Sequence, residues 1–126
     1  WTALTAACFY GHLKVVNALL ARKKIQINQA KNDGATPLNI ACEHGHVKIV
    51  NALLVRKGIQ INQAANNGCT PLYAACQHGH VKVVKALLTN KDIDINKEWE
   101  GKTPLACAIE KDHTEIAALL QQHGAK

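Results

Sequence analysis

Nearly the same stretch of sequence occurs twice in the chain. The segment ATPLNIACEHGHVKIVNALL begins at Ala35 and returns as CTPLYAACQHGHVKVVKALL from Cys69, and weaker copies open and close the sequence. The threonine that marks the register stands at positions 2, 36, 70 and 103, so the periods are 34, 34 and 33 residues. A fixed period of this size is typical of a solenoid, in which one structural unit stacks on the next. We therefore predict a single repeat domain with units at about 1–34, 35–68, 69–101 and 102–126.

Each unit has the pattern of a helical hairpin. Thr36-Pro37 and its counterparts predict a helix start, because a threonine hydroxyl caps free backbone N–H groups and proline suits the first helical position. Leu38, Ala41 and Cys42 then form one apolar face at helical spacing. Gly45 ends this first helix, and a second amphipathic helix follows over about 47–54. The fold class predicted is all-α, an α-solenoid of about four helix-turn-helix units.

The segments that join the units have a different pattern. Isoleucine alternates with polar residues over 25–28, 59–62 and 93–96, which predicts extended backbone. Turn-forming residues follow at Asn32-Asp33-Gly34 and Asn66-Asn67-Gly68. We expect a projecting β-hairpin or loop, called a finger, between successive units.

These motifs together resemble the ankyrin repeat. G-x-T-P-L, A-C/A-x-x-G-H, V-V-x-x-L-L and I-N recur in one order and register over essentially the whole chain. The chain departs from the family after T-P-L, where histidine is usual and this sequence has Thr5, Asn39, Tyr73 and Ala106. The resemblance implies a stack whose fingers and first helices line a concave groove that binds other proteins. The partner implied is a protein whose identity the sequence leaves open.

The residues that differ between copies are the candidates for partner binding. The five aromatic residues lie outside the positions filled by Leu, Ala, Cys, Val and Ile, so we expect none of them in the core. Residue pairs at i,i+4 spacing share the helix face opposite that core, and exposed aromatics are typical interface anchors. An alternative interpretation is that Trp1, Phe9 and Tyr10 cover the end of the stack and that Trp99 compensates a shortened finger. The candidate partner-binding residues are Phe9, Tyr10, Asn32, Asp33, Glu43, His44, Asn66, Asn67, Tyr73, Gln77, His78, Trp99, Glu110 and Lys111.

The seven histidines do not predict a metal centre. His12, His46, His80 and His113 belong to the repeat motif, and we interpret them as structural residues that start the second helices. His44 and His78 occupy one repeated position, but packed helices lie about 8–10 Å apart, too far for both rings to bind one ion. A weak adventitious ion at His46 is the most that this pattern allows.

The five cysteines do not predict disulfides. Cys8, Cys42 and Cys76 repeat one core position, whereas a disulfide needs Cα atoms within about 7 Å. We interpret them as small buried residues in a reducing compartment. Cys107 is expected to pack as well, while Cys69 could be exposed and reactive. The expected location is intracellular and cytoplasmic, or the host cytoplasm if the source is a pathogen.

No motif for catalysis is present in the sequence. We find no glycine-rich phosphate loop, nucleophile elbow or H-E-x-x-H, so we expect no enzymatic activity and no cofactor.

No apolar run approaches the ~20 residues that cross a bilayer, so we expect no membrane insertion. We also expect a monomer, unless the N-terminal end of the stack associates.

The chain carries a formal charge of +6, which suggests an alternative function. Basic residues on and after the second helices could form a stripe that binds nucleic acid or an anionic surface. No aromatic residues interleave this stripe to stack bases, so a protein partner is preferred over nucleic acid. The stripe comprises Lys14, Arg22, Lys23, Lys48, Arg56, Lys57, Lys82 and Lys85.

Overall fold

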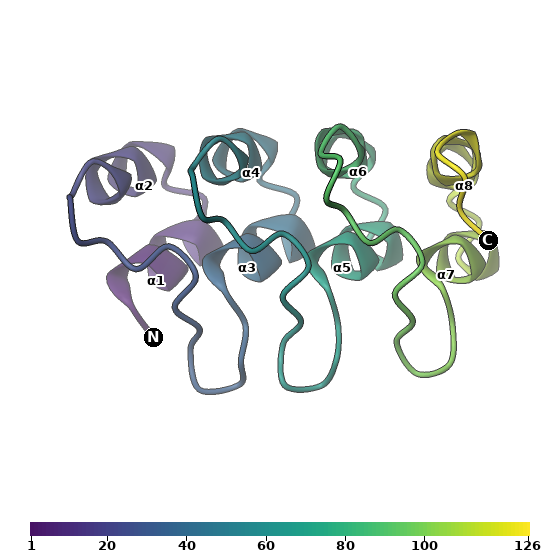
Figure 1. The fold of residues 1–126 in the computed structure, drawn as a ribbon, viewed down its shortest axis with the longest axis horizontal. Coiled ribbons are helices and arrows are strands. Elements are labelled where there is room, and N and C mark those ends of the chain that lie inside the picture. The colour runs from purple at the N-terminus through teal and green to yellow at the C-terminus, as the bar shows by residue number, and fades with distance from the viewer.

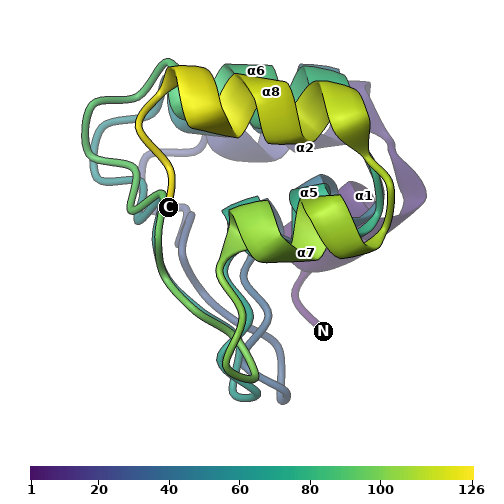
Figure 2. The same cartoon turned by 90° about the vertical axis from the view of Figure 1, so that its right-hand side faces the viewer.

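The computed structural model describes residues 1–126 and consists of eight short helices in two rows (Figure 1). One row holds the first helix of each hairpin and the other holds the second. Seen along the stack, the rows form two layers, and the fingers project from one end of the first-helix layer (Figure 2). None of the helices has the length and hydropathy needed to span a membrane. In chain order the helices are α1 (Ala3–Tyr10), α2 (Leu13–Leu20), α3 (Pro37–Glu43), α4 (Val47–Leu54), α5 (Pro71–Gln77), α6 (Val81–Leu88), α7 (Pro104–Glu110) and α8 (Thr114–Gln122).

The threonines cap the first helices as the sequence predicts. The hydroxyl of Thr36 accepts a hydrogen bond from the Asn39 N–H at 3.1 Å, and Thr70 accepts one from the Tyr73 N–H at 3.2 Å. Thr2 and Thr103 cap α1 and α7 in the same way. These bonds satisfy backbone donors that have no partner inside the helix, which fixes where each hairpin begins.

The histidines after the turns join each hairpin to the preceding one. The imidazole Nε2 of His80 lies 2.8 Å from the Glu43 carbonyl oxygen at the end of α3. His46 and His113 reach Phe9 and Gln77 in the same way, at 3.3 Å and 3.2 Å. The prediction of a structural role is therefore confirmed for His46, His80 and His113, whose rings each provide a carbonyl at a helix C-terminus with a donor, but not for His12.

One continuous hydrophobic core runs through the stack. Leu38, Leu72 and Leu105 repeat one buried position of the first helices, and Val50 and Val84 repeat one of the second helices. Cys8, Cys42 and Cys76 are fully buried, and all five cysteines are unpaired thiols, as the sequence predicts. Each hairpin thus completes the core of its neighbour, which is how a solenoid is stabilised.

The segments between hairpins contain turns in place of the predicted extended strands. Residues Ile27 and Asn28 lie in a turn, and the only β-type pairing is an isolated bridge between Trp99 and Lys102. The expected extended strands are therefore wrong. The first two segments are loops, whereas Trp99 and Lys102 form a minimal antiparallel hairpin in the third. The alternating isoleucines arise because Ile25, Ile59 and their neighbours pack against the core from these turns. We call residues 21–29, 55–63 and 89–97 linking loops 1, 2 and 3, and residues 30–35, 64–69 and 98–102 fingers 1, 2 and 3.

Asparagine side chains hold successive linking loops together. In linking loop 1, Asn28 donates to the Gly58 carbonyl at 2.8 Å and accepts from the Gln60 N–H at 3.0 Å. Asn62 makes the equivalent bonds to Asp92 and Asp94, both at 2.7 Å. The same framework is thus built twice along one edge of the stack.

Candidate protein-binding surface

The candidate residues at the ends of the first helices form an exposed row. Glu43 and Glu110 are the last residues of α3 and α7, and His44 and Lys111 follow them directly. All four are exposed, as are Phe9, Tyr10 and His78, whereas Gln77 is half-buried. Asn32, Asp33, Asn66 and Asn67 are exposed on the fingers. We call this set of first-helix ends and finger residues the finger surface.

An aromatic cluster occupies the N-terminal end of the finger surface. The Phe9 ring centroid lies 5.4 Å from that of Trp1, 4.9 Å from Tyr10 and 4.7 Å from His44. The Lys31 Nζ atom lies 4.7 Å from the Trp1 ring centroid, a cation–π contact. Tyr10 nevertheless remains 67% exposed. The cluster therefore presents aromatic surface at this end of the stack.

Tyr73 is the clearest error among the sequence expectations. Its side chain is only 3% exposed, so the expectation that no aromatic residue lies in the core is wrong. The Trp99 ring packs against Tyr73 in a T-shaped contact with centroids 5.2 Å apart, and Trp99 Nε1 donates to the Asn67 carbonyl at 2.8 Å. Helical spacing placed Tyr73 on the outward face of α5, but it gave no sign that finger 3 folds over that face.

Trp99 separates two hollows on the finger surface. One, of about 310 Å³, lies between Trp99 and α7 and is lined by Glu110 and Lys111. The other, of about 250 Å³, lies toward finger 1 and is lined by Glu43 and His78. Gln77 and Trp99 line both. Residues that differ between the repeats therefore meet around a shared aromatic wall.

Two carboxylates of the finger surface have lysine partners. Lys102 pairs with Glu110, and this hydrogen-bonded ion pair lowers the pKa of Glu110. Lys31 pairs with Asp33 at 2.6 Å, which lowers the pKa of Asp33. His78 Nε2 lies 3.9 Å from a Glu43 carboxylate oxygen. The carboxylates of Asp33 and Glu110 are therefore kept ionised and oriented at neutral pH, as binding groups with fixed charge.

Asn39 has a structural role that was not predicted from the sequence. This residue is 6% exposed; its Oδ1 accepts from the Thr36 N–H at 2.9 Å, and its Nδ2 donates to the Gln63 carbonyl at 3.0 Å. At the equivalent position of α1, the Thr5 hydroxyl oxygen accepts a hydrogen bond from the Thr2 N–H at 2.9 Å. A polar side chain three residues after the capping threonine is the pattern of a capping box, so the signal was present in the sequence.

Cys69 is half-buried, and its surroundings do not favour the predicted reactivity. Burial, with smaller contributions from Glu43 and Cys107, raises the pKa of the Cys69 thiol to about 11. Because the thiolate is the reactive form, this thiol is a poor nucleophile at neutral pH.

Among the histidines, His44 and His46 stack with ring centroids 6.2 Å apart. No three His, Cys, Asp or Glu side chains are placed to hold a metal ion.

The stacked hairpins and fingers define a helical repeat protein of the solenoid class. A family model described as ankyrin repeats (3 copies) matches residues 1–65 and 55–126, so the chain belongs to the ankyrin repeat family. No curated protein matches the chain significantly. Ankyrin repeats are in general protein–protein interaction modules and are typically not catalytic.

Proposed function

We propose that the protein binds a partner protein through the concave groove formed by its fingers and first helices. The observation that carries this proposal is the pair of hollows around Trp99, because both are lined by residues that differ from repeat to repeat. Residues of the repeat motif are used for caps, turns and core, so they would select no particular partner. The variable residues around Trp99 are free to do so.

The proposed partner segment crosses surfaces of two kinds. At the N-terminal end it meets the exposed ring of Tyr10, and aromatic residues of this kind are common anchors of interfaces. Around Trp99 it meets the carboxylate of Glu43, the ion-paired carboxylate of Glu110 and the cation of Lys111. A segment with apolar residues at one end and charges of both signs at the other would complement this surface. Tyr73 takes part indirectly, as the buried support of Trp99.

The proposal is tested with a matched pair of double variants. Gln77→Ala with Lys111→Glu changes the finger surface, whereas Asn51→Ala with Lys48→Glu makes the same chemical changes at exposed positions of α4. Affinity capture and mass spectrometry would identify proteins retained by the wild type and by the α4 variant but lost from the finger-surface variant. For a purified partner we expect at least about tenfold weaker binding to the finger-surface variant alone. Equal binding to both variants would contradict the proposed groove.

The alternative function, nucleic-acid binding by the second helices, has a separate test. Lys14, Lys48 and Lys82 are all exposed there, whereas Lys85 has a carboxylate oxygen of Glu115 at 4.0 Å. A gel-shift titration with DNA and RNA at several salt concentrations measures this activity directly. Tight binding that weakens steeply with salt would support the stripe in place of the groove.

A further inference from the structure

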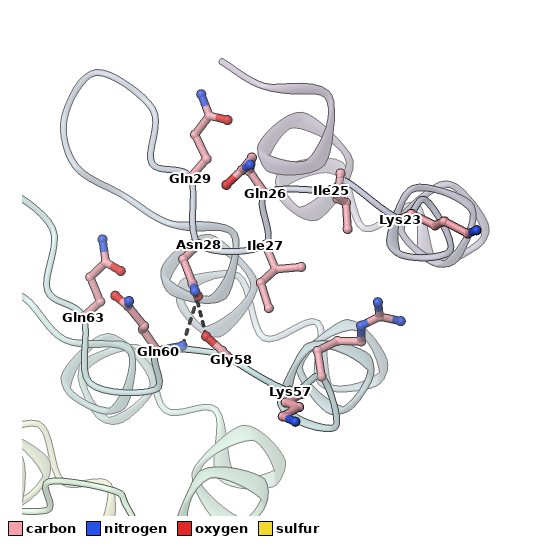
Figure 3. Close-up of a pocket in the computed structure, with 11 residues that line it drawn as sticks. Lys23, Ile25, Gln26, Ile27, Asn28, Gln29, Lys57, Gly58, Gln60 and Gln63 are labelled. Carbon is pink, nitrogen blue, oxygen red and sulfur yellow. Dashed lines mark hydrogen bonds between the residues drawn. The ribbon is translucent and has the colours of Figure 1, made fainter.

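A polar hollow lies away from the finger surface, between linking loops 1 and 2 (Figure 3). Its volume is about 730 Å³, and Ile25 and Ile27 are the only apolar side chains among its 11 lining residues. Ligand pockets of this volume are common in proteins, but most are lined chiefly by apolar residues. A ligand of this hollow would therefore have to be strongly polar.

The charge of this hollow has one sign. Lys23, Arg56 and Lys57 contribute three basic groups, and no lining residue is acidic. A second hollow of about 510 Å³ adjoins it along linking loop 1 and adds Arg22 and Lys24. The chain has no acidic residue before Asp33, which lies on finger 1 and pairs with Lys31. The positive field of the hollow is thus not offset by its own walls.

Carboxamides supply neutral donors beside these cations. Figure 3 shows Gln26, Gln29, Gln60 and Gln63 at one end of the hollow, with Lys23 and Lys57 at the other. Asn28, between them, is committed to the bonds that join the two loops. These glutamines form hydrogen bonds within the protein only through main-chain atoms, so their side-chain N–H groups are free to donate. They are available for a ligand in a way that Asn28 is not.

The next pair of loops provides an internal comparison. Linking loops 2 and 3 are joined by the same asparagine bonds, from Asn62 to Asp92 and Asp94. At the positions of Gly58 and Gln60, however, linking loop 3 has Asp92 and Asp94, and Asn90 replaces Arg56. The repeat framework therefore does not require a positive hollow, since the equivalent place farther along carries two carboxylates.

We propose that the hollow defined by Lys23, Arg56, Lys57 and the four glutamines, the basic hollow, binds a small anion carrying two or more phosphate groups. Arginine and lysine are the side chains suited to phosphate oxygens, and amide N–H groups complete their coordination. The volume accommodates several such groups, and the scarcity of apolar lining disfavours a folded protein segment. The same chemistry is offered by a soluble polyphosphate and by the headgroup of a phosphorylated lipid.

The first test measures binding of inorganic tripolyphosphate by calorimetry. Lys23→Gln, Arg56→Gln and Lys57→Gln are combined in one variant, and Lys14→Gln, Lys48→Gln and Lys82→Gln in a control that removes the same charge from α2, α4 and α6. Because hydrogen bonds to charged groups are the strong ones, we expect at least about tenfold weaker binding to the first variant and little change in the control. Equal weakening of both variants overturns the proposal.

The second test creates a site where the chain has none. Asp92→Gly with Asp94→Gln gives linking loop 3 the residues that linking loop 2 has at these positions. We expect this variant to bind a second tripolyphosphate, with both sites lost when Lys57→Gln is added. A stoichiometry unchanged from the wild type would contradict the role assigned to the loop charges.

Vesicles distinguish the two sources of phosphate. Phosphatidylcholine vesicles with and without phosphatidylinositol bisphosphate are sedimented with the wild type and with the basic-hollow variant. If the protein sediments only with vesicles that contain the phosphorylated lipid, and only when the basic hollow is intact, the ligand is a lipid headgroup. Binding of tripolyphosphate without retention on vesicles identifies a soluble anion, and failure of both probes overturns the proposal.

Discussion

His80 of the third hairpin donates to the Glu43 carbonyl of the second across 2.8 Å. The Nε2 atoms of His46 and His113 make the same contact one hairpin earlier and one later. The His12 ring makes no such hydrogen bond and is exposed. The repeated histidine thus bonds to the preceding hairpin at three positions, whereas His12 does not.

This difference predicts unequal effects of substitution by alanine. His80→Ala leaves the Glu43 carbonyl without its partner, so we expect a loss of about 1 kcal/mol in the free energy of unfolding. His12→Ala breaks no such bond and should change stability by less than about 0.5 kcal/mol. Urea denaturation followed by circular dichroism measures both. Equal losses would show that the contact between hairpins is not the source of the effect.

Gly79 and Gly101 separate two causes of destabilisation by alanine. Both have positive φ, 75° and 79°, so alanine is strained at either position. A Cβ atom at Gly79 would lie 2.9 Å from His113 Cε1, whereas at Gly101 it would meet nothing within 4 Å. We expect a loss of about 1 kcal/mol from Gly101→Ala and a distinctly larger one from Gly79→Ala, measured by thermal unfolding. A larger loss at Gly101 would contradict this assignment.

Tyr73 should behave as a core residue in spite of its polar group. Replacing it with alanine empties a buried site under Trp99, and we expect a loss of about 3–5 kcal/mol in unfolding free energy. Tyr10→Ala is the matched control, because this tyrosine is 67% exposed and its loss should cost far less. The intrinsic fluorescence of Trp99, in a Trp1→Phe background, would report the change locally. A Tyr73→Ala protein as stable as Tyr10→Ala would refute the burial.

The cysteines should resist thiol reagents while the protein is folded. Burial raises the pKa of Cys8 to about 12 and that of Cys69 to about 11, and it raises the pKa values of Cys42 and Cys76 as well. At pH 8 a thiol with a pKa of 11 is ionised in only about one molecule in a thousand, so alkylation should be slow. Mass spectrometry after iodoacetamide treatment measures this. Rapid labelling of Cys69 in native protein would restore the reactive-thiol expectation.

Hydrogen exchange should be slowest in the middle of the stack. The second and third hairpins are packed on both sides, whereas the outer ones have a neighbour on one side only. We therefore expect residues 36–88 to be the best protected, with faster exchange in α1, α2 and α8. Equal protection of α1 and α2 would show that the aromatic cluster around Phe9 seals the N-terminal end.

The sequence was informative where a residue acts on near neighbours in the chain. Capping by Thr36, the turn glycines and the buried Cys42 follow from local spacing and were predicted. The burial of Tyr73 was not predictable in this way, because it depends on Trp99 at the far end of the same unit. The basic hollow likewise needs two linking loops side by side, held by Asn28. Both features depend on contacts between segments that are distant in the sequence, whose geometry local spacing does not encode.

The backward direction of the histidine bonds has a consequence for how such a chain can change in length. Each of the two middle hairpins has a histidine ring that contacts a carbonyl of the preceding hairpin and a carbonyl that the histidine of the next hairpin contacts. A duplicated copy of residues 36–69, inserted in frame after Cys69, would carry both groups with it. The new boundary would then repeat the histidine–carbonyl hydrogen bond of the old one. The chain can therefore gain hairpins by duplication without a change in the residues that form this bond.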